Sequence, residues 1–584
     1  MYNKKGNTTT PVLQETASPA QESRLARSIF WLLLFGIVAT AGIVEVRTAL
    51  GETQTWDEGI HIWSGYAYLT QGDYSWNTEH PPLVKLVSAL PLLRLGLTSP
   101  PSPAKPSAGD QVEYGRHFLY KNRRDADTIL ITARSANILL TLLFLTAVAW
   151  WTRRRWGSAA GLCAAALCAF DPNLIAHGRY VTTDYPLTAF FFFACVLWVE
   201  YLENGGRARL LAASATIAIA MVVKFSAILL VPSLVLLYVV CWIRRPGEFP
   251  VRRLFITGAT VFAVLTATVA IVYWPETLRC FRGNVVRLEK VVNQDNFIGL
   301  TLAWLGGKLN LPAHDYLLGL ARVAEHNTGG HPSYLLGMRS NTGFWYYFPV
   351  AFAVKSTLAA WAALLLVAAL GAWAVFRRGL RAITPMALGL AVPPLLFFAF
   401  SMTSAINLGM RHILPIYPFL YVGVAVLATR RLQSRAGQVM AAAVLVIAVV
   451  QIGECASIYP DYLAFFNAAA GGPGRGPEYL VDSNIDWGQD VKKLVHWLDQ
   501  HGTRRVRVHY FGNAIMPYYG IQEVGFPDPL DKEGWDKVDD IVAVNVTALM
   551  APYVPLNALA PVRLREPDAK VGWSMYVYDW RKKK

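Results

Sequence analysis

Two neighbouring carboxylates follow the first apolar stretch of the chain. Asp57 and Glu58 come directly after Trp56, a few residues beyond that stretch. A carboxylate next to low-dielectric surroundings has a raised pKa, which suits it to abstract a proton near neutral pH. The alternative interpretation is a solvated loop in which these acids have no special role. We predict Asp57 and Glu58 as catalytic candidates.

A second polar segment contains Glu79, His80, two prolines and Lys85. The prolines stop a preceding helix and suit the start of a new one. Residues 83–97 are apolar but too few to cross a bilayer, so we predict a helix lying at the membrane interface. Lys85 would then lie at the depth of a lipid phosphate. The alternative is an ordinary helix in which Lys85 extends its amine toward water.

A third acidic residue, Asp184, follows Thr182 and Thr183 at the start of a later apolar stretch, and Pro186 comes shortly after it. Ionisable groups at the edge of the hydrocarbon layer are costly, so they tend to be paired or functional. A helix start capped by Thr183 or Asp184 is the simpler interpretation. The two are compatible, and we predict Asp184 as a catalytic candidate.

Four cationic or imidazole side chains lie at the same ends of apolar stretches as these acids. Arginine binds phosphate through paired hydrogen bonds, and lysine acts as a point charge. We therefore predict that they help to bind an anionic lipid head group. They are Arg134, Lys224, Arg411 and His412.

Evidence for a metal ion or a disulfide is weaker. Residues 276–343 include His314, Asp315, Glu325, His326 and His331, but their spacing matches no standard metal site and favours a solvated loop. A divalent cation, Mg²⁺ or Mn²⁺, stays open at the predicted carboxylates. A disulfide between Cys280 and Cys455 also stays open, because spacing says nothing of their proximity.

The elements that must position these residues are transmembrane helices. Among 584 residues, 54% are hydrophobic and 16% are charged, with a mean hydropathy of +0.33. Soluble domains carry roughly 25% charged residues. The net charge of +15 comes largely from arginines in short loops, where they fix topology, so we expect no nucleic-acid partner.

We predict about eleven transmembrane helices, since about 20 apolar residues cross a bilayer. Residues 1–27 are polar and are predicted to form a disordered cytoplasmic tail. The transmembrane domain is predicted over 28–457. Its helices are predicted at 28–50, 129–151, 157–175, 185–202, 208–223, 225–243, 254–274, 346–376, 383–402, 411–429 and 437–457.

Every even-numbered helix is followed by a short loop rich in arginine, such as Arg153 to Arg155. The positive-inside rule places these loops and the N-terminus in the cytoplasm. Loops 51–128 and 276–343 and the C-terminal domain, 459–584, then lie outside. That domain is predicted to be a small α/β domain with strands at 506–510, 541–546 and 574–578 and a helix within 486–500.

Together these features resemble the GT-C glycosyltransferases of the protein O-mannosyltransferase type (glycosyltransferase family 39), which also include the aminoarabinose transferases that modify lipid A. The resemblance rests on the acidic pair after the first helix, the His-Pro-Pro-x-x-Lys segment and the acid that opens the fourth helix. Residues 482–490 (Asp-Ser-Asn-Ile-Asp-Trp-Gly-Gln-Asp) resemble a segment of bacterial members. The loop 276–343 is too short for the β-trefoil module of eukaryotic protein mannosyltransferases.

The resemblance implies an inverting transfer of a sugar from a polyprenyl-phosphate-linked donor to the hydroxyl of a protein, lipid or glycan acceptor. It assigns Asp57 to the catalytic position with Glu58 beside it, and His80 and Lys85 to the neighbourhood of the lipid phosphate. Asp184 matches a second acidic position that orients the acceptor or helps to hold a cation. The resemblance assigns no position to the other four candidates for phosphate binding. They are assigned only because they share one side of the membrane with the acids: Arg134, Lys224, Arg411 and His412.

Two other classes of function stay open. A lipid or sugar transporter would also cross the membrane many times, although such proteins often show internal repeats and polar residues at the middle of the bilayer. An assembly or receptor protein would leave the outer acids without a role. We expect a multi-pass protein of the cytoplasmic (inner) membrane whose C-terminus and active site lie outside.

Overall fold

The computed structural model describes residues 23–100, 107–281, 300, 304, 314–380, 383–429, 434–527, 532–550, 553–555 and 559–583. Most of the predicted N-terminal tail, positions 282–299, 301–303 and 305–313 of the loop 276–343, and the arginines at 381, 430 and 431 lie outside the described residues.

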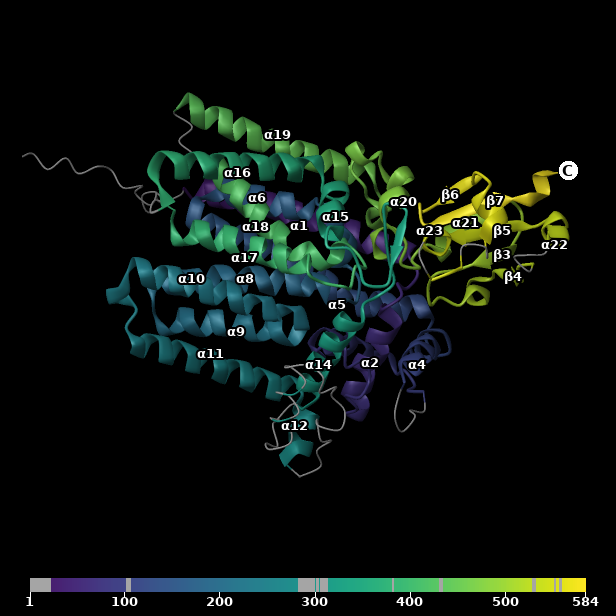
Figure 1. Cartoon of the computed structure of the whole chain (residues 1–584), viewed down its shortest axis with the longest axis horizontal. Coiled ribbons are helices and arrows are strands. Elements are labelled where there is room, and N and C mark those ends of the chain that lie inside the picture. The colour runs from purple at the N-terminus through teal and green to yellow at the C-terminus, as the bar shows by residue number, and fades with distance from the viewer. Residues whose placement is uncertain are drawn as a thin grey trace, which may run out of the picture.

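Long apolar helices run side by side and form a bundle (Figure 1). Within the described residues, eight are long and apolar enough to cross a membrane, or up to nine if one bent pair forms a single span. This confirms a polytopic α-helical membrane protein. The eight are α1 (Arg24–Gly51), α5 (Ala126–Trp156), α8 (Asp184–Asn204), η2 with α10 (Phe225–Arg244), α11 (Val251–Val272), α16 (Leu358–Arg378), η6 with α18 and η7 (Met410–Ala428), and α19 (Arg435–Ser457).

The predicted helix at 157–175 is instead a bent pair. Helix α6 (Ser158–Ala169) and helix α7 (Pro172–Gly178) meet at an angle of 69°. The Asp171 side chain accepts hydrogen bonds from the backbone N–H groups of Asn173 and Leu174 at 2.8 and 2.9 Å, and Pro172 takes the first helical position. A new helix therefore begins at Asp171, because its carboxylate satisfies the free N–H groups there.

The predicted helix at 346–376 is also divided, into α15 (Tyr347–Lys355) and α16. Thr357 caps α16 by accepting a hydrogen bond from Ala360 N at 3.0 Å. Two further predicted spans form as helices of 17 residues, α9 (Arg207–Val223) and α17 (Pro385–Ser401). They lie within the bundle beside the longer helices (Figure 1).

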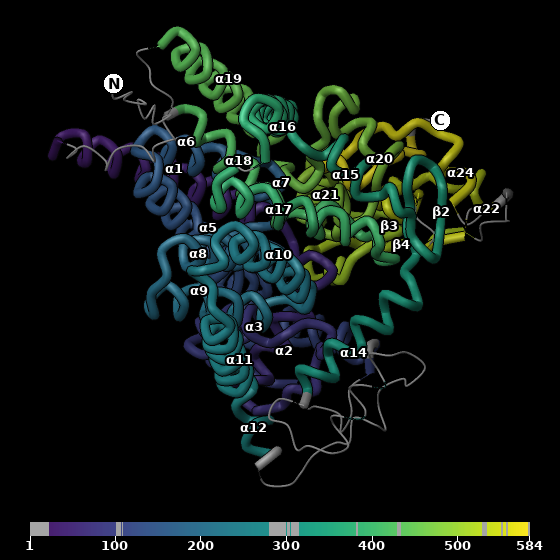
Figure 2. Tube along the Cα trace, turned by 60° about the vertical axis from the view of Figure 1, so that its left-hand side comes forward, coloured from purple at the N-terminus to yellow at the C-terminus, as the bar shows by residue number. Residues whose placement is uncertain are grey.

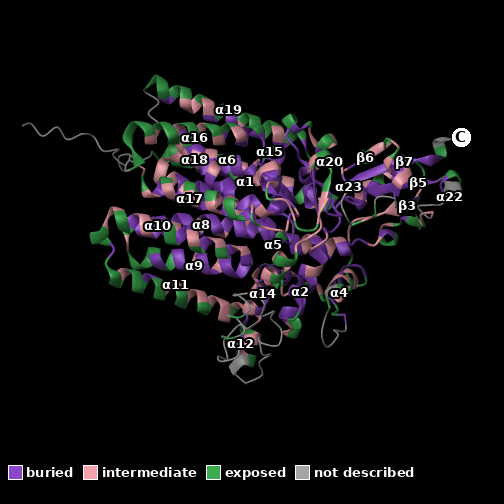
Figure 3. Ribbon diagram, viewed as in Figure 1, coloured by how far each residue is buried: buried purple, intermediate pink, exposed green. Residues whose placement is uncertain are grey.

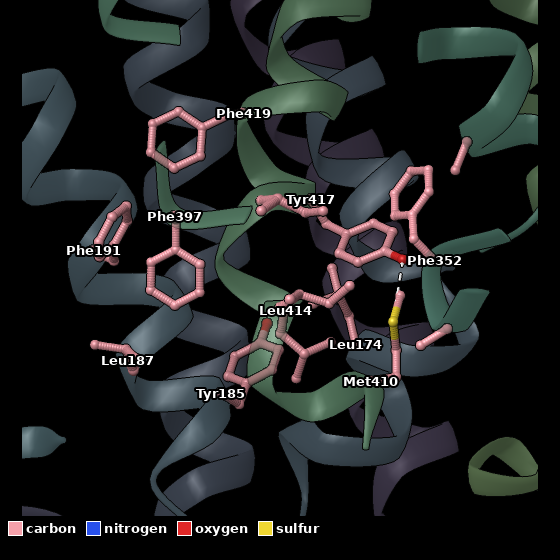
Figure 4. Packing of buried hydrophobic residues seen from close by; sticks show 14 of the residues in the cluster. Leu174, Tyr185, Leu187, Phe191, Phe352, Phe397, Met410, Leu414, Tyr417 and Phe419 are labelled. Atoms are coloured by element: carbon pink, nitrogen blue, oxygen red, sulfur yellow. Dashed lines mark hydrogen bonds between the residues drawn. The ribbon is translucent and has the colours of Figure 1, made fainter. Parts of the chain in front are cut away.

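Helix α8 is the buried centre of the bundle, whereas α11 lies at its edge. Within an apolar stretch of 18 residues in α8, 78% of the residues are buried (Figure 3). In the corresponding stretch of α11, 6% are buried. Aromatic rings fill the space around α8, where Phe191 packs edge-on against Phe397 at 5.0 Å between ring centroids (Figure 4). The exposed apolar faces of α11, α16 and α19 are those that would contact lipid.

The arginine-rich connections of the bundle gather at one end. Arg155, at the end of α5, pairs with Glu203, at the end of α8, at 2.5 Å. Glu203 also accepts a hydrogen bond from the backbone N–H of Met386, at the start of α17, at 3.2 Å. Arg244, at the end of α10, donates to the backbone oxygen of Ile383 at 2.6 Å. Alternate helices therefore begin and end at a common face, as the spacing of the arginines predicts.

The helices and strands of the two long predicted outer loops lie at the end of the bundle opposite the arginines (Figures 1 and 2). The predicted interfacial helix at 83–97 forms as the helix α3 (Leu83–Ala89) followed by the 3₁₀ helix η1 (Leu90–Leu95). Val87 of α3 and Leu90 and Leu93 of η1 are exposed. The elements here are α2 (Glu58–Gln71), α3 (Leu83–Ala89), η1 (Leu90–Leu95), α4 (Ala108–Tyr120), α12 (Trp274–Phe281), α14 (His314–Gly329), β1 (Ser333–Leu335) and β2 (Met338–Ser340).

The C-terminal region is a small α/β domain, as predicted. Its sheet has the order β4-β3-β5-β7-β6, with β3 parallel to β4 and β5, and β7 antiparallel to β5 and β6. The sequence predicts β3, β5, β7 and α21 but misses the short edge strands β4 and β6. The elements are α20 (Gly476–Tyr479), α21 (Val491–Gln500), β3 (Arg505–His509), β4 (Gln522–Val524), α22 (Lys532–Asp536), β5 (Ile541–Asn545), α23 (Val546–Met550), α24 (Ala560–Arg563), β6 (Ala569–Val571) and β7 (Met575–Asp579).

Candidate active site

The loop that carries Asp57 is fixed between the helix bundle and the C-terminal region. The backbone N–H of Trp56 donates to the backbone oxygen of Trp487 at 2.9 Å, and that of Thr53 donates to Gln489 at 2.9 Å. Asn513 donates from its side chain to the backbone oxygen of Trp56 at 2.8 Å. Hydrogen bonds to the segment 482–490 therefore fix the position of the loop that carries Asp57.

Asp57 and Asp184 meet at the same guanidinium group. Arg411 Nη1 lies 3.0 Å from Asp57 Oδ2 and 3.7 Å from Asp184 Oδ2. The Asp57 side chain remains 23% exposed, whereas that of Asp184 is 2% exposed. The structure thus brings together three residues that the sequence analysis placed on one side of the membrane, and it leaves Asp57 as the more accessible carboxylate.

Lys224 completes this cluster. Its ammonium group lies 2.5 Å from Asp184 Oδ1, at the point where α9 ends and the backbone becomes extended. Asp184 is the first residue of α8, where the helix dipole also favours a carboxylate. Asp184 therefore holds two cations, Lys224 and Arg411, at the same end of the bundle. We call Asp57, Asp184, Lys224 and Arg411 the charged cluster.

Arg411 is positioned by a close approach between two chain segments. A Cβ atom on Gly409 would lie 2.4 Å from Ser483 Oγ, so a larger residue would displace this hydroxyl. The backbone N–H of Met410 donates to Asn484 Oδ1 at 2.9 Å. The guanidinium of Arg411 then stacks over the Trp487 ring at 4.2 Å, an arrangement that stabilises a cation in a site shielded from water.

Arg411 retains hydrogen-bonding capacity. Its side chain is 9% exposed, and its Nε has no hydrogen-bond partner among the described residues. Lys224 likewise donates to one carboxylate in the described part of the chain, which leaves two of its three N–H donors for a ligand. Arg411 Nε itself is buried, so Lys224 is the cation of the cluster with N–H donors left to bind an anion.

Glu58 and Arg134 form a buried pair that is separate from the charged cluster. Arg134 donates to Glu58 at 2.6 and 2.8 Å, and its other donors reach the backbone oxygens of Ala49 and Thr53 at 2.8 and 2.9 Å. Both side chains are fully buried. Their hydrogen bonds fix the loop that carries Asp57, so neither group is available to a substrate.

Lys85 also lies outside the charged cluster. Its buried ammonium donates to Tyr68 Oη at 2.8 Å, to Asn77 O and Oδ1 at 2.7 and 3.1 Å, and to His80 O at 2.8 Å. Burial holds the pKa of this amine well below its usual value. Because protein oxygens occupy all its donors, Lys85 fixes the turn that carries His80 rather than reaching a lipid phosphate.

Two predicted histidines border the charged cluster. His80 is half-buried, and its ring packs edge-on against His61 at 5.3 Å. Burial and the nearby charges of His61, Lys224 and Lys85 lower the pKa of His80 well below its usual value, so the ring is neutral at pH 7. His412 is half-buried beside Phe348 and within electrostatic range of Lys224. Both rings therefore lie at the edge of the charged cluster.

The structure bears on two further predictions, a metal site at the carboxylates and a disulfide between Cys280 and Cys455. Among the described residues, no group of three or more His, Cys, Asp or Glu side chains is arranged to hold a metal ion. The position between Asp57 and Asp184 is taken by Arg411 Nη1. Among the described residues Cys455 is a free thiol whose Sγ donates to Tyr462 Oη at 3.9 Å. The side chain of Cys280 lies outside the described residues, so the pairing of Cys280 with Cys455 stays a prediction.

Two residues at the site were not predicted. Trp487 supports Arg411, and Asp482 lies within electrostatic range of it as a third carboxylate. The sequence marks their segment, 482–490, only by its resemblance to bacterial members of the family. The signal that could have located it was the concentration of acidic and amide side chains in so short a stretch.

Comparison with known families gives one match. Residues 130–274 match the model of the dolichyl-phosphate-mannose-protein mannosyltransferase family. The resemblance is confirmed over this segment. It includes Arg134, Asp184 and Lys224, and the enzyme class of the family is glycosyltransferase.

No curated protein sequence matches the chain. Among solved structures, ArnT from Cupriavidus metallidurans is similar over 94% of this chain, with 15% identity and a TM-score of 0.45. The match covers 97% of the ArnT chain bound to undecaprenyl phosphate and 98% of the apo chain. The oligosaccharyltransferase AglB from Archaeoglobus fulgidus, in complex with an inhibitory peptide and a dolichol-phosphate, matches over 89% of this chain and 70% of its own, with 12% identity and a TM-score of 0.45.

Proposed function

We propose that the protein transfers a sugar from a polyprenyl-phosphate-linked donor to an acceptor hydroxyl at the outer face of the membrane, with inversion at the anomeric carbon. The observation that carries this proposal is the charged cluster. It pairs an accessible carboxylate, Asp57, with two cations, Lys224 and Arg411, of which Lys224 has N–H donors left for an anion. A base beside an anion-binding site is what displacement of a sugar from a phosphate requires.

Lys224 and Arg411 bind the donor phosphate in this proposal. As the bond between the anomeric carbon and the phosphate oxygen breaks, its electron pair leaves with the phosphate, and negative charge grows there. Preorganised cations in a site shielded from water stabilise such charge, often more than any other single interaction. Asp184 holds both cations in place, and His80 and His412 border the same space.

Asp57 is the base. It takes the proton from the acceptor hydroxyl while the acceptor oxygen forms the new bond to the anomeric carbon from the face opposite the phosphate. A phosphate is already a good leaving group, so no second acid is needed, in contrast to glycoside hydrolysis, where a carboxylic acid protonates the leaving oxygen. A single displacement of this kind inverts the anomeric configuration.

The proposed orientation places the arginine-rich end of the bundle in the cytoplasm, by the positive-inside rule. The N-terminus then lies inside the cell, and the charged cluster and the C-terminal domain, 459–584, lie outside the cytoplasmic (inner) membrane. The transmembrane domain corresponds to 28–457. Mg²⁺ or Mn²⁺ is not part of this proposal, because Arg411 Nη1 occupies the position between Asp57 and Asp184.

The test is transfer by purified protein in detergent, with a polyprenyl-phosphate sugar as donor and an extract of cell-envelope glycans, lipids and proteins as acceptors. We expect the sugar to appear on an acceptor with the anomeric configuration inverted, as read by NMR. A transporter requires a sealed membrane and would give no product in detergent. Release of the sugar with retained configuration would contradict direct displacement.

A further inference from the structure

His61 is a buried imidazole one helical turn after the proposed base. Its backbone N–H donates to the backbone oxygen of Asp57 at 3.0 Å, which is the hydrogen bond that a helix makes between residues four apart. Asp57 has helical backbone angles as the first residue before α2. Because residues four apart lie on one face of a helix, the side chains of Asp57 and His61 are neighbours.

One backbone oxygen sets the tautomer of the His61 ring. Nδ1 lies 2.7 Å from Val181 O, and a carbonyl oxygen can only accept, so Nδ1 carries the proton. Val181 is itself held in place, because its N–H donates to Glu58 Oε1 at 3.0 Å. The buried pair of Glu58 and Arg134 therefore fixes the His61 ring as well as the loop that carries Asp57.

The second ring nitrogen of His61 can accept a hydrogen bond. Burial lowers the pKa of the imidazole more than the nearby carboxylates of Asp57 and Asp184 raise it, so the ring is neutral at pH 7 and Nε2 keeps its lone pair. Nε2 makes no hydrogen bond to a described residue and is not one of the fully buried polar atoms without a partner. In a residue that is 2% exposed, Nε2 is thus the polar atom left for a ligand.

Two imidazoles lead from Asp57 to Lys224. His61 lies within electrostatic range of Asp57, and its ring packs edge-on against the ring of His80 at 5.3 Å. His80 in turn lies within electrostatic range of Lys224. Both rings are neutral at pH 7, so they offer a ligand hydrogen-bonding nitrogens rather than charge.

The sugar of the donor has to lie between the phosphate and the base. Its anomeric carbon is bonded to the phosphate that Lys224 binds in the proposed function, and the acceptor oxygen beside Asp57 attacks the same carbon. The hydroxyls of the sugar ring therefore come close to the imidazoles that lie between these two residues. A hydroxyl can donate to Nε2 of His61, whereas the oxygens of a phosphodiester carry no proton to donate.

We propose that His61 Nε2 accepts a hydrogen bond from a hydroxyl of the donor sugar and so orients the sugar ring between the phosphate and Asp57. This inference rests on the proposed function, because it names a specificity-determining residue of the same site. A donor that lacks this hydroxyl would leave Nε2 unpaired and would bind less well. The inference also gives the pair of Glu58 and Arg134 a second task, which is to hold the tautomer of His61 through Val181.

The test is equilibrium binding of radiolabelled lipids to the purified full-length protein in detergent. The probes are undecaprenyl phosphate alone and undecaprenyl phosphate linked to mannose, glucose or galactose. The amide N–H of asparagine can replace Nδ1 as the donor to Val181, whereas the longer glutamine places an amide oxygen near the position of Nε2. The two variants therefore separate the hydrogen bond within the protein from the one to the sugar.

We expect His61→Asn to bind undecaprenyl phosphate like the parent protein, but to bind the best sugar-linked lipid about fivefold to tenfold more weakly, the effect of one lost hydrogen bond. His61→Gln should recover most of that affinity. An unchanged unfolding temperature shows that His61→Asn has folded. His496→Asn, at an exposed position on α21, is the matched control and should bind all the lipids like the parent protein.

Binding needs no turnover, so the result does not depend on the proposed chemistry. Asp57→Asn should lose transfer but keep the affinity for the sugar-linked lipid, which separates the two claims. A purely structural role of His61 would give the opposite pattern, with His61→Asn like the parent protein and His61→Gln impaired. That pattern, or an equal loss of affinity for undecaprenyl phosphate alone, would overturn the inference.

Discussion

Arg411 Nη1 lies 3.0 Å from Asp57 Oδ2, although more than 350 positions separate the two residues in the sequence. The same nitrogen lies 3.7 Å from Asp184, so one guanidinium orders both carboxylates. This relationship makes the charged cluster a single unit, in which the base, its orienting cation and the anion-binding groups depend on one another.

Replacing Arg411 with lysine should lower kcat/KM for the donor about 100-fold to 1,000-fold, the usual effect of removing one preorganised donor to developing charge. Lysine keeps the charge but lacks the planar group that stacks on Trp487 and reaches two carboxylates. Steady-state assays of sugar transfer measure the effect. Arg504→Lys, in an exposed pair with Asp499, is the matched control and should leave kcat/KM unchanged.

Lys224→Met should weaken inhibition by free undecaprenyl phosphate, used as a probe of the donor site, because one of the two proposed phosphate ligands is lost. It should also destabilise the fold, since it leaves the buried Asp184 with less compensation. The double variant Lys224→Met with Asp184→Asn should recover the unfolding temperature but not the inhibition. Full recovery of both would mean that Lys224 has only a structural role.

Arg134→Met should lower stability rather than change the chemistry. Breaking a buried ion pair on one side costs about 3–5 kcal/mol, because the remaining charge is left unpaired. Glu58 would lose two hydrogen bonds from Arg134. Thermal unfolding in detergent should show a clear drop for Arg134→Met, and a smaller one for Arg134→Met with Glu58→Gln. A variant of normal stability that fails to bind undecaprenyl phosphate would restore the predicted phosphate-binding role.

The C-terminal domain should lose stability as the pH rises. Burial raises the pKa of Asp486 to about 8, and the group accepts hydrogen bonds from Asn545 at 2.6 Å and from the N–H of Thr547 at 3.0 Å. The folded state therefore holds a proton that the unfolded state releases near pH 4. Protonated Asp486 makes its full contribution to the free energy of unfolding below about pH 4. That contribution is lost as the pH rises through about 8.

Asp486→Asn removes this titration while keeping the shape of the side chain. Between pH 5 and pH 8, unfolding of the variant should depend on pH less than unfolding of the parent protein, measured by near-ultraviolet circular dichroism. Asp499→Asn, at an exposed position, is the control and should keep the parent's pH dependence. Equal pH dependence for the parent and Asp486→Asn would contradict the proposed burial effect.

The sequence predicts the parts of the molecule that hydrophobicity and charge decide. It locates the helices and the shared end of Asp57, Asp184, Lys224 and Arg411, because arginine-rich loops mark the opposite end. It does not predict that α6 and α7 bend apart at Asp171, since the two helices together are apolar enough for one membrane span. Capping by one side chain, not apolar content, ends the helix there.

The roles of Lys85 and Arg134 could not be predicted, because their partners include backbone oxygens that only the folded chain brings near. The same holds for Trp487, which reaches the site from a domain that follows the whole helix bundle. Residue type and the predicted side of the membrane therefore identify candidate site residues. Burial in the folded chain decides which of these side chains a substrate can reach.

The central claim is that Asp57 is the base of the transfer reaction, and Asp57→Asn tests it most directly. With saturating donor and acceptor, we expect kcat to fall at least about 100-fold, the lower range for loss of a positioned base, while undecaprenyl phosphate still inhibits. Glu113→Gln, an exposed acid on α4, should retain full activity. Turnover of Asp57→Asn close to that of the parent protein would contradict the account.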